Sequence, residues 1–474
     1  MSTSTFGADM AQPTIPEDRV ALDALRKLLL EQADAMKDAL GPSQSISPRL
    51  DVELYERRLA DERSRPATLA KLFLLGTPVA IGDATSALDP ENIGALAEMG
   101  LVELDEDVLR PRARVSSHEG VLVASDVLGG SDPADFVPGP SPSAQRVERL
   151  TIRRPVRAAL DLGTGSGIQA LLTARHSERV VGVDVNERAL AFASFNAALN
   201  GLTNLDFRAG SWLEPVVGER FDLIVANPPY VVSPDSAFLY RDGELAADAV
   251  TQHLLQAVPA HLEEGGFAHV MGNWAYARDD DWRTPLEAWL AGSGCDALLL
   301  KYPGGDLVSY AAQWNLLLLA EGREAYLSAV DRWLDYYRRE GIETIADGMV
   351  VLRRRSGGKN WVRAIEIPAP PTGRAGEQVH RIFEARDRRD ELADDETVRA
   401  TRFAAAPGLR LTKRADRAKV ELEAGIGFAA PLPATVAEQI ASLDGTRPLG
   451  DVIDDAEAAA IARRLFALGL LVGP

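Results

Sequence analysis

The sequence Ala158-Ala-Leu-Asp-Leu-Gly-Thr-Gly-Ser-Gly-Ile168 predicts a buried strand, a glycine turn and the start of a helix. Three glycines follow the apolar run at alternate positions, namely Gly163, Gly165 and Gly167. Glycines at this spacing allow a tight turn and let a ligand lie against bare main chain. The helix that follows directs its free N–H groups to the same place. By itself the turn also fits a dinucleotide site, so later residues decide its meaning.

A second strand, Val180–Val183, ends directly before Asp184. An acidic side chain at the tip of this strand can accept hydrogen bonds from both hydroxyls of a ribose, as in folds that bind nucleoside cofactors. The structural alternative is a helix N-cap, a role that the neighbouring Asn186 can also fill. Given the glycine turn before it, we expect Asp184 to bind a ribose.

The hydrophobic strand Phe221–Ala226 ends in the tetrad Asn227-Pro228-Pro229-Tyr230. Ligands bind at this edge of an open α/β sheet. The prolines fix the backbone and remove N–H donors. The Asn227 side-chain oxygen and the Pro228 carbonyl can each accept one hydrogen of a planar amide or amine, and Tyr230 can stack on the planar group. The tetrad therefore predicts a clamp for a flat nitrogen.

With the glycine turn and the tetrad in this order, the chain resembles class I S-adenosylmethionine-dependent methyltransferases of the small-domain group with an Asn-Pro-Pro-Tyr tetrad. It is most similar to the HemK/PrmC type, which methylates a glutamine side-chain amide, and the resemblance covers about residues 126–355. The resemblance implies S-adenosyl-L-methionine as cofactor. The cofactor-binding residues that it implies are Asp161, Gly163, Thr164, Gly165, Gly167, Asp184, Val185, Ser211, Trp212 and Asn227. The implied catalytic residues, which hold the target nitrogen, are Asn227, Pro228, Pro229 and Tyr230.

Three features depart from this type. Ala209-Gly-Ser-Trp212 lacks the acid that the family often carries near the end of its third strand, so we expect Ser211 or the backbone to hold adenine, with Trp212 nearby. Val137-Pro-Gly-Pro-Ser141 stands where the family has Pro-Arg-Pro-Glu-Thr, which makes a different substrate conceivable. The HemK type is also shorter and lacks the C-terminal part of this chain.

Two further segments are weaker site candidates. Arg241-Asp-Gly-Glu244 resembles the family's glycine-containing stretch beyond the tetrad, and we expect it to line the substrate entrance. Asn273-Trp274 follows the fifth strand and faces the same sheet edge. A core role is the alternative for this pair.

Alternating strands and helices in the middle of the chain predict an α/β fold with a seven-stranded Rossmann-like sheet. The strands are expected at Arg157–Leu162, Val180–Val183, Leu205–Arg208, Phe221–Ala226, Phe267–Met271, Ala297–Tyr302 and Met349–Arg353. Linker-like composition at Gly129–Ser143, Arg353–Lys359 and Pro368–Gly376 separates three domains. These are a winged-helix-like α+β domain at 13–128, the methyltransferase domain at 129–358 and a small winged-helix-like domain at 376–474.

For each of the two flanking domains, a generic fold without a binding role is the alternative to the winged-helix interpretation. Helices followed by a hairpin, with strands at Leu101–Leu104, Val108–Val115 and Val121–Ser125, suggest the N-terminal winged helix, but a generic α+β cap fits as well. Its expected recognition helix, Pro90–Met99, carries two glutamates and no Lys or Arg, which disfavours DNA reading. The C-terminal domain resembles modules that bind leader peptides of ribosomally made natural products, with a generic winged fold as the alternative.

The amino-acid composition disfavours several classes of partner, namely duplex nucleic acid, metal ions and membranes. The formal charge is −19, which argues against extensive duplex binding. Six scattered histidines give no metal-ligand spacing, so we expect no metal. The single cysteine, Cys295, favours a reducing, cytoplasmic setting, and the sequence has neither a run of about 20 apolar residues nor a leader, so we expect a soluble protein without membrane contact.

Several functions remain open at this point. The first choice is N-methylation of a protein or peptide, at a glutamine amide. The second is methylation of a guanine N2 or adenine N6 in RNA or DNA, for which Arg146–Arg157 and Arg353–Lys359 would supply a local phosphate patch. A non-catalytic binding module on a cofactor fold is the third, and a small-molecule amine is a further acceptor.

Overall fold

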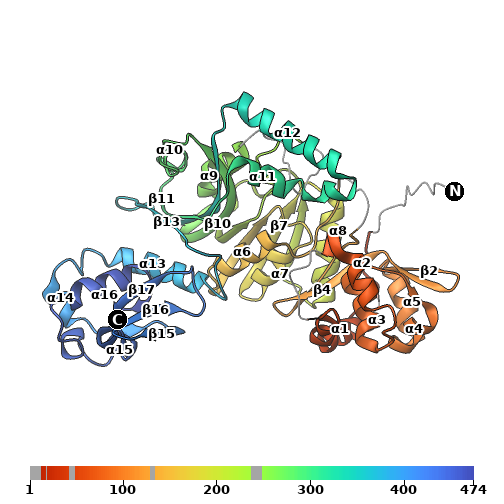
Figure 1. The fold of residues 1–474 in the computed structure, drawn as a ribbon, viewed down its shortest axis with the longest axis horizontal. Coiled ribbons are helices and arrows are strands. Elements are labelled where there is room, and N and C mark those ends of the chain that lie inside the picture. Colours follow the sequence, from red (N-terminus) through yellow and green to blue (C-terminus); the bar gives the residue numbers. More distant parts are fainter. Residues whose placement is uncertain (1–11, 18, 42–47, 129–133, 236–247, 474) are drawn as a thin grey trace.

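The computed structural model describes residues 12–17, 19–41, 48–128, 134–235 and 248–473. A central sheet occupies the middle of the molecule, with an N-terminal unit (red and orange) on one side and a C-terminal unit (blue) on the other (Figure 1). Among these residues no helix is both long and apolar enough to span a bilayer.

The central sheet has eight strands in the order β13-β11-β12-β10-β9-β6-β7-β8. Their bounds are β6 (Val156–Leu162), β7 (Ser177–Asp184), β8 (Leu205–Ala209), β9 (Phe221–Ala226), β10 (Leu262–Tyr276), β11 (Cys295–Lys301), β12 (Thr344–Arg354) and β13 (Val362–Glu366). β12 pairs antiparallel with β10 and β11, and the other neighbours pair in parallel. The carboxyl ends of β6, β7 and β9 therefore meet at one edge of the sheet.

The expected count of seven strands is wrong, because β13 adds an eighth. It pairs in parallel with β11, from Ala297 opposite Val362 to Lys301 opposite Glu366. Its side chains alternate between exposed Val362 and buried Ile365, the pattern of an edge strand covered on one face. The Arg- and Gly-rich stretch directly before it made this part of the chain look like a linker.

Helices cover both faces of the sheet. Their bounds are α6 (Pro142–Leu150), α7 (Ile168–Ala174), α8 (Glu187–Leu199), α9 (Ala249–Ala257), α10 (Thr284–Leu290), α11 (Leu307–Trp314) and α12 (Arg323–Glu340), with short turns η2 (Glu214–Val216), η3 (Val258–His261) and η4 (Leu316–Ala320). α9 and α10 pack on one face through residues such as Leu254 and Leu286. α6 and α7 pack on the opposite face through Val147 and Ala170. Successive residues of the strands point alternately into these two cores, as expected for a sheet that is buried on both faces.

The N-terminal unit consists of helices, a small antiparallel sheet in the order β1-β3-β2 and a separate hairpin, β4–β5. The bounds are α1 (Val20–Ala39), α2 (Pro48–Arg58), α3 (Arg65–Leu69), the π-helical η1 (Ala70–Leu75), β1 (Val79–Ala80), α4 (Ile81–Ala87), α5 (Pro90–Glu98), β2 (Val102–Asp105), β3 (Val108–Pro111), β4 (Ala113–His118) and β5 (Val121–Asp126). The single strand expected at Val108–Val115 is wrong: the chain leaves the small sheet at Arg112, where β3 ends and β4 starts a new pairing.

The N-terminal unit is docked on α8 through shared packing and side-chain hydrogen bonds. Its apolar core includes Phe192 and Phe195 of α8. The Asn196 amide bonds the Ala124 backbone twice, accepting from its N–H at 2.7 Å and donating to its C=O at 2.9 Å. Asn200 does the same with Leu122, at 2.9 and 2.7 Å. α8 therefore holds the outer edge of β5 as a neighbouring strand would.

The C-terminal unit has a core of its own and contacts the sheet through its first helix. Its bounds are α13 (Gly376–Asp387), α14 (Asp395–Ala400), β14 (Ala404–Ala405), β15 (Leu409–Arg414), β16 (Arg417–Leu422), β17 (Ala429–Pro433), α15 (Ala434–Ala441), η5 (Leu449–Asp451), α16 (Ala458–Ala467) and β18 (Leu471–Val472). In α13, the Phe383 ring lies 4.9 Å from Trp361 and 5.2 Å from Phe267, centroid to centroid. This aromatic contact places α13 against the same face as α6.

Candidate functional site

The glycine turn lies between β6 and α7 in a backbone conformation that favours glycine. Gly163, Gly165 and Gly167 have φ angles of +68°, +53° and +85°. The N–H groups of Gly163 and Thr164 donate to the Val183 carbonyl at 2.9 and 3.0 Å. The turn is therefore tied to the end of β7, and a side chain at any of its glycines would strain the backbone.

Asp161 lies beneath the turn rather than on its open side. Its Oδ2 accepts a hydrogen bond from the Thr164 hydroxyl at 2.7 Å and another from the Ala170 N–H at 2.9 Å. Burial raises the pKa of this carboxyl to about 7, although both hydrogen bonds oppose the rise. Asp161 thus joins the turn to the first residues of α7.

Asp184 closes the turn from the end of β7. Its two oxygens accept from the Gly165 N–H at 2.8 Å and the Asn186 N–H at 2.9 Å. Burial raises its pKa, against the opposing effect of these bonds. The N-cap of α8 is Asn186, whose side chain accepts from Arg188 and Ala189, so the capping role does not belong to Asp184. The carboxylate has lone pairs beyond the two already used.

One cavity of about 1320 Å³ joins most of the predicted site residues. Those that line it are Gly163, Thr164, Gly165, Asp184, Val185, Ser211, Trp212, Asn227, Pro228, Pro229 and Tyr230. Asp161 and Gly167 are not among its lining residues. Its volume exceeds the range of about 300–1,000 Å³ for sites of single drug-sized ligands, so a cofactor and part of a second molecule can share it.

The loop after β8 brings Ser211 and Trp212 to the cavity. Trp212 has a φ of +50°, which is uncommon for a bulky side chain. Its ring lies 5.8 Å from that of His253 in α9, centroid to centroid. Strained backbone of this kind concentrates at ligand sites, where packing over-determines the conformation.

The tetrad lies directly beside the glycine turn. A Cβ on Gly163 would come within 3.7 Å of the Pro228 Cα, so the two motifs approach backbone to backbone. The Asn227 Nδ2 donates to the Ser143 hydroxyl at 3.4 Å. Its Oδ1 is buried and has no hydrogen-bond partner among the described residues. Tyr230 is also buried, and burial raises the pKa of its hydroxyl.

A polar cluster lies on the tetrad side of the cavity, and of its members only Asn273 was named from the sequence as a site candidate. Arg146 and Asp347 form an ion pair at 2.6 Å, and Asn273 Nδ2 lies 3.4 Å from the second Asp347 oxygen. Burial raises the pKa of Asp347 to about 6, while the Arg146 charge opposes the rise. The Tyr310 hydroxyl donates to Asn273 Oδ1 at 2.8 Å. An aspartate within the apolar run of β12 was the one available signal.

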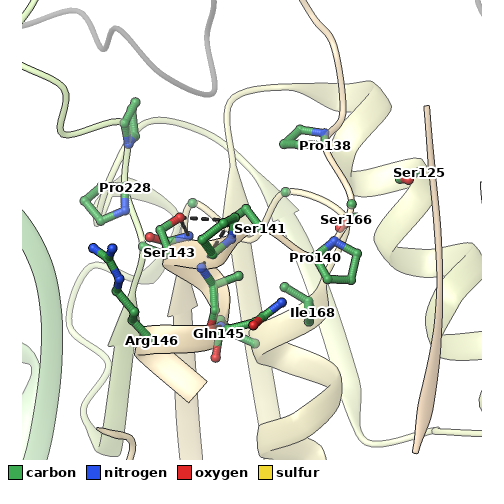
Figure 2. A pocket seen from close by; sticks show the side chains of 18 of the residues that line it. Ser125, Pro138, Pro140, Ser141, Ser143, Gln145, Arg146, Ser166, Ile168 and Pro228 are labelled. Atoms are coloured by element: carbon green, nitrogen blue, oxygen red, sulfur yellow. Dashed lines mark hydrogen bonds between the residues drawn. The ribbon is translucent and has the colours of Figure 1, made fainter. Parts of the chain in front are cut away.

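Figure 2 shows how α6 serves this side of the cavity. Ser141, Ser143 and Arg146 project from the start of α6 toward Pro228. Ser166 and Ile168, from the turn and α7, lie on the opposite side of the same view. The first turn of α6 is therefore part of the wall that faces the tetrad.

The weaker candidates separate in the structure. Asn273 lines the cavity, whereas Trp274 is a core residue whose Nε1 donates to the Trp282 carbonyl at 2.9 Å. Arg241–Glu244 lies outside the described residues. Within the described part of the chain, no group of three or more His, Cys, Asp and Glu residues is arranged to hold a metal ion.

Known protein families match two parts of the chain. The Methyltransferase small domain family matches residues 145–277, which include the glycine turn, the tetrad and the whole of β10. A domain of unknown function (DUF7059) matches residues 22–113, in the N-terminal unit. The two matches thus fall on separate units of the fold.

Curated relatives support the first match. The release factor glutamine methyltransferase of Xylella fastidiosa (strain Temecula1) is 38% identical over 143 residues, which is 27% of this chain and 50% of that protein. That of Yersinia pestis is 34% identical over 197 residues, 38% of this chain and 68% of that protein. The chain spans about half the length of the first of these relatives.

Among solved structures, the ribosomal protein L11 methylase of Lactobacillus delbrueckii subsp. bulgaricus is 26% identical, with a TM-score of 0.25, over 34% of this chain and 71% of that chain. The family assignment rests on the sequence relatives and on the glycine turn and tetrad that face one cavity. This chain belongs to the HemK/PrmC-like family of class I S-adenosylmethionine-dependent methyltransferases.

Proposed function

We propose that the chain is an N-methyltransferase that uses S-adenosyl-L-methionine to methylate a planar amide nitrogen, with a glutamine side chain of a protein as first choice. The observation that carries this proposal is the Asn227 Oδ1 at the cavity wall, which is buried and has no hydrogen-bond partner within the described part of the chain. A buried acceptor without a partner costs about 1–3 kcal/mol, so such a group is rarely retained without a use. A primary amide supplies the N–H donor that this oxygen lacks.

The cofactor would lie on the glycine turn. Gly163, Thr164 and Gly165 line the cavity and would cradle the methionine part, while Asp161 and Gly167 support the turn from below. Asp184 would bind the ribose hydroxyls with its remaining lone pairs. When bound, the cofactor supplies a methyl group made electrophilic by its sulfonium.

The adenine end would lie against residues that follow β7 and β8. Val185, Ser211 and Trp212 line the cavity there. The Ser211 hydroxyl offers one donor and two acceptor sites, which suit a base edge. Trp212, already held at a strained φ, presents an aromatic surface for packing.

The tetrad would hold and orient the target nitrogen. Asn227 Oδ1 and the Pro228 carbonyl would each accept one hydrogen of the amide, which fixes its plane and helps localise its lone pair. Pro228 and Pro229 carry no N–H, so no main-chain donor there competes for these acceptors. Tyr230 would stack on the amide plane. The proton can leave after methylation, so no strong base is required.

Most arginines of the two basic runs that would serve nucleic acid form ion pairs within the protein, which favours a protein acceptor over an RNA or DNA base. The ion pairs join Arg146 to Asp347, Arg153 to Glu148, Arg157 to Asp222, Arg353 to Asp296 and Asp387, and Arg355 to Asp296. A phosphate would have to compete with these carboxylates.

We further propose that the flanking units, at 13–128 and 376–474 around the methyltransferase domain at 129–358, are winged-helix-like docking modules for the acceptor. The small antiparallel sheets that accompany the helices in both units support this proposal. A cytoplasmic location is supported by the single cysteine, which is buried.

The test is incubation of the full chain with tritium-labelled S-adenosylmethionine and a purified bacterial peptide chain release factor, followed by peptide mapping. The expected result is label on one glutamine, recovered as N5-methylglutamine by mass spectrometry. The contrary result has two parts: the release factor stays unlabelled, and a bacterial extract used in its place yields label that nuclease removes. Together they would identify a nucleic-acid base as acceptor and contradict the proposal. A parallel reaction without enzyme sets the background.

A further inference from the structure

Two serine hydroxyls at the start of α6 are linked to each other, and one of them, that of Ser143, contacts the tetrad. Ser141 is the N-cap of α6, and its Oγ accepts from the Ala144 N–H at 3.1 Å. Its Oγ lies 2.9 Å from the Ser143 Oγ, and the Asn227 Nδ2 donates to Ser143 at 3.4 Å. Figure 2 shows Ser141 and Ser143 adjacent, on the side of α6 that faces Pro228. The chain of hydrogen bonds therefore runs from a helix cap to Asn227.

The orientation of the Asn227 amide decides whether its oxygen or its NH2 group faces the nitrogen that accepts the methyl group. A carboxamide has an oxygen and an NH2 of nearly the same shape and opposite hydrogen-bonding character. With Nδ2 on Ser143, the Oδ1, which none of the described residues hydrogen-bonds, is left for a donor. In the reversed orientation two N–H groups would confront the NH2 of the acceptor, and the site would repel its own substrate.

Ser143 can enforce this orientation because its hydroxyl hydrogen has other acceptors nearby. The Ser141 Oγ lies at 2.9 Å. The Ser143 hydroxyl is also close enough to the Tyr230 hydroxyl to lower the Tyr230 pKa, against the larger rise from burial. When the Ser143 hydrogen points to either of these oxygens, only its lone pairs face Asn227, and lone pairs select the NH2 end.

We propose that Ser143 is a positioning residue for methyl transfer, which holds Asn227 with Oδ1 toward the acceptor nitrogen, and that Ser141 fixes Ser143 in turn. This inference rests on the proposed function. Ser143 does not contact the reacting atoms in this account, and it acts through Asn227. The separation of 3.4 Å is long for a hydrogen bond, and such bonds commonly tighten in the complex with substrate.

The test compares Ser143→Ala, Ser143→Thr, Asn227→Ala and the double variant Ser143→Ala/Asn227→Ala. For each, kcat and KM are measured by tritium transfer to a purified bacterial release factor, and cofactor affinity by calorimetry. Ser143→Ala should lower kcat about tenfold, the worth of one hydrogen bond, with cofactor affinity within about twofold of wild type. Ser143→Thr keeps the hydroxyl and should restore most of the rate.

The double variant separates positioning from a general structural effect. If Ser143 acts through Asn227, then Ser143→Ala should add nothing to the loss already caused by Asn227→Ala. Ser356→Ala is the matched control, because Ser356 also hydrogen-bonds through its hydroxyl, to Glu264, but does not line the cavity.

The outcomes distinguish this inference from the function on which it rests. Wild-type turnover in Ser143→Ala, or losses that multiply in the double variant, would overturn the positioning role alone. Wild-type turnover in Asn227→Ala, or no transfer by the wild-type chain, would contradict the proposed function and the positioning role with it.

Discussion

Two carboxylates, the buried Asp161 and the half-buried Asp184, serve the glycine turn in different ways. Asp161 bonds Thr164 and Ala170 from beneath and does not line the cavity. Asp184 accepts a hydrogen bond from the Gly165 N–H and lines the cavity. The same residue type thus supports the turn from beneath at one position and lines the cavity at the other.

The pH dependence of stability should carry the signature of Asp161. Its pKa is about 7 in the folded chain and 3.8 in the reference state, so between these values the folded state holds a proton that the unfolded state has lost. The contribution of Asp161 to stability must therefore fall as the pH rises through this window, by at most about 1.4 kcal/mol per pH unit for one proton.

Asp161→Asn removes this titration and keeps an oxygen that can accept from Thr164 and Ala170. In urea unfolding between about pH 4 and 8, the wild type should lose stability relative to Asp161→Asn as the pH rises to about 7, and the difference should then level off. A wild type that gains stability relative to the variant over this window contradicts the account of Asp161.

Contiguous motifs made part of the site predictable at the level of residues. The turn, Asp184 and the tetrad each follow a strand, so their place at one sheet edge follows from the parallel topology alone. The pair of Arg146 and Asp347 was not predictable, because 201 residues separate its members and neither belongs to a motif. The sequence did not predict that Asp161 lies beneath the turn, outside the cavity lining. Its hydrogen-bond partners, Thr164 and Ala170, become apparent only in the folded turn.

At the scale of elements, the glycine turn fits closely against α8. A Cβ on Gly167 would lie 3.0 Å from the Ala193 Cβ, and Gly167 itself has a φ of +85°. Gly165 has a φ of +53°, but a Cβ there would meet nothing within 4 Å. A side chain at Gly165 would therefore meet backbone strain alone, whereas one at Gly167 would meet both backbone strain and steric contact.

Gly165→Ala should cost about 1–2 kcal/mol of unfolding free energy, since it carries the left-handed strain alone. Gly167→Ala should cost more, because strain and contact with α8 add, and Ala193→Gly in the same chain should recover part of the loss. Urea unfolding of the four chains measures this. Equal losses for the two glycines would contradict the close packing of the turn on α8.

Strands were predictable where an apolar run was flanked by turns and was buried on both faces, as in β6 and β9. β13 was missed because an edge strand alternates over only five residues and follows an Arg-rich stretch. The end of β3 was missed because the residues on both sides of Arg112 have strand character, and only tertiary pairing distinguishes the two strands.

At the scale of the molecule, the N-terminal unit is bound to the methyltransferase domain through α8. Asn196 is fully buried, and its Nδ2 also donates to the Ser166 carbonyl of the glycine turn at 2.8 Å. One side chain thus connects β5, α8 and the turn. Movement of the N-terminal unit and the shape of the cofactor site are expected to be coupled here.

Asn196→Ala should loosen both partners at once, because it leaves buried groups of Ala124 and Ser166 unpaired, at about 1–3 kcal/mol each. Hydrogen exchange should increase in β5 and in the glycine turn, and remain unchanged in β15–β17. Asn360→Ala is the matched control. It removes a side-chain amide that donates to the Arg355 carbonyl, next to the edge strand β13. Exchange that rises uniformly over the chain contradicts the local coupling.

The most direct test of the whole account is the split between cofactor binding and turnover in Asn227→Ala. If the tetrad clamps the acceptor nitrogen beside the cofactor, kcat for release factor methylation should fall at least about hundredfold, while the dissociation constant of S-adenosylmethionine stays within about twofold of wild type. Turnover near the wild-type rate, with cofactor binding intact and Asn360→Ala as reference, would show that the Asn227 oxygen does not hold the reacting nitrogen.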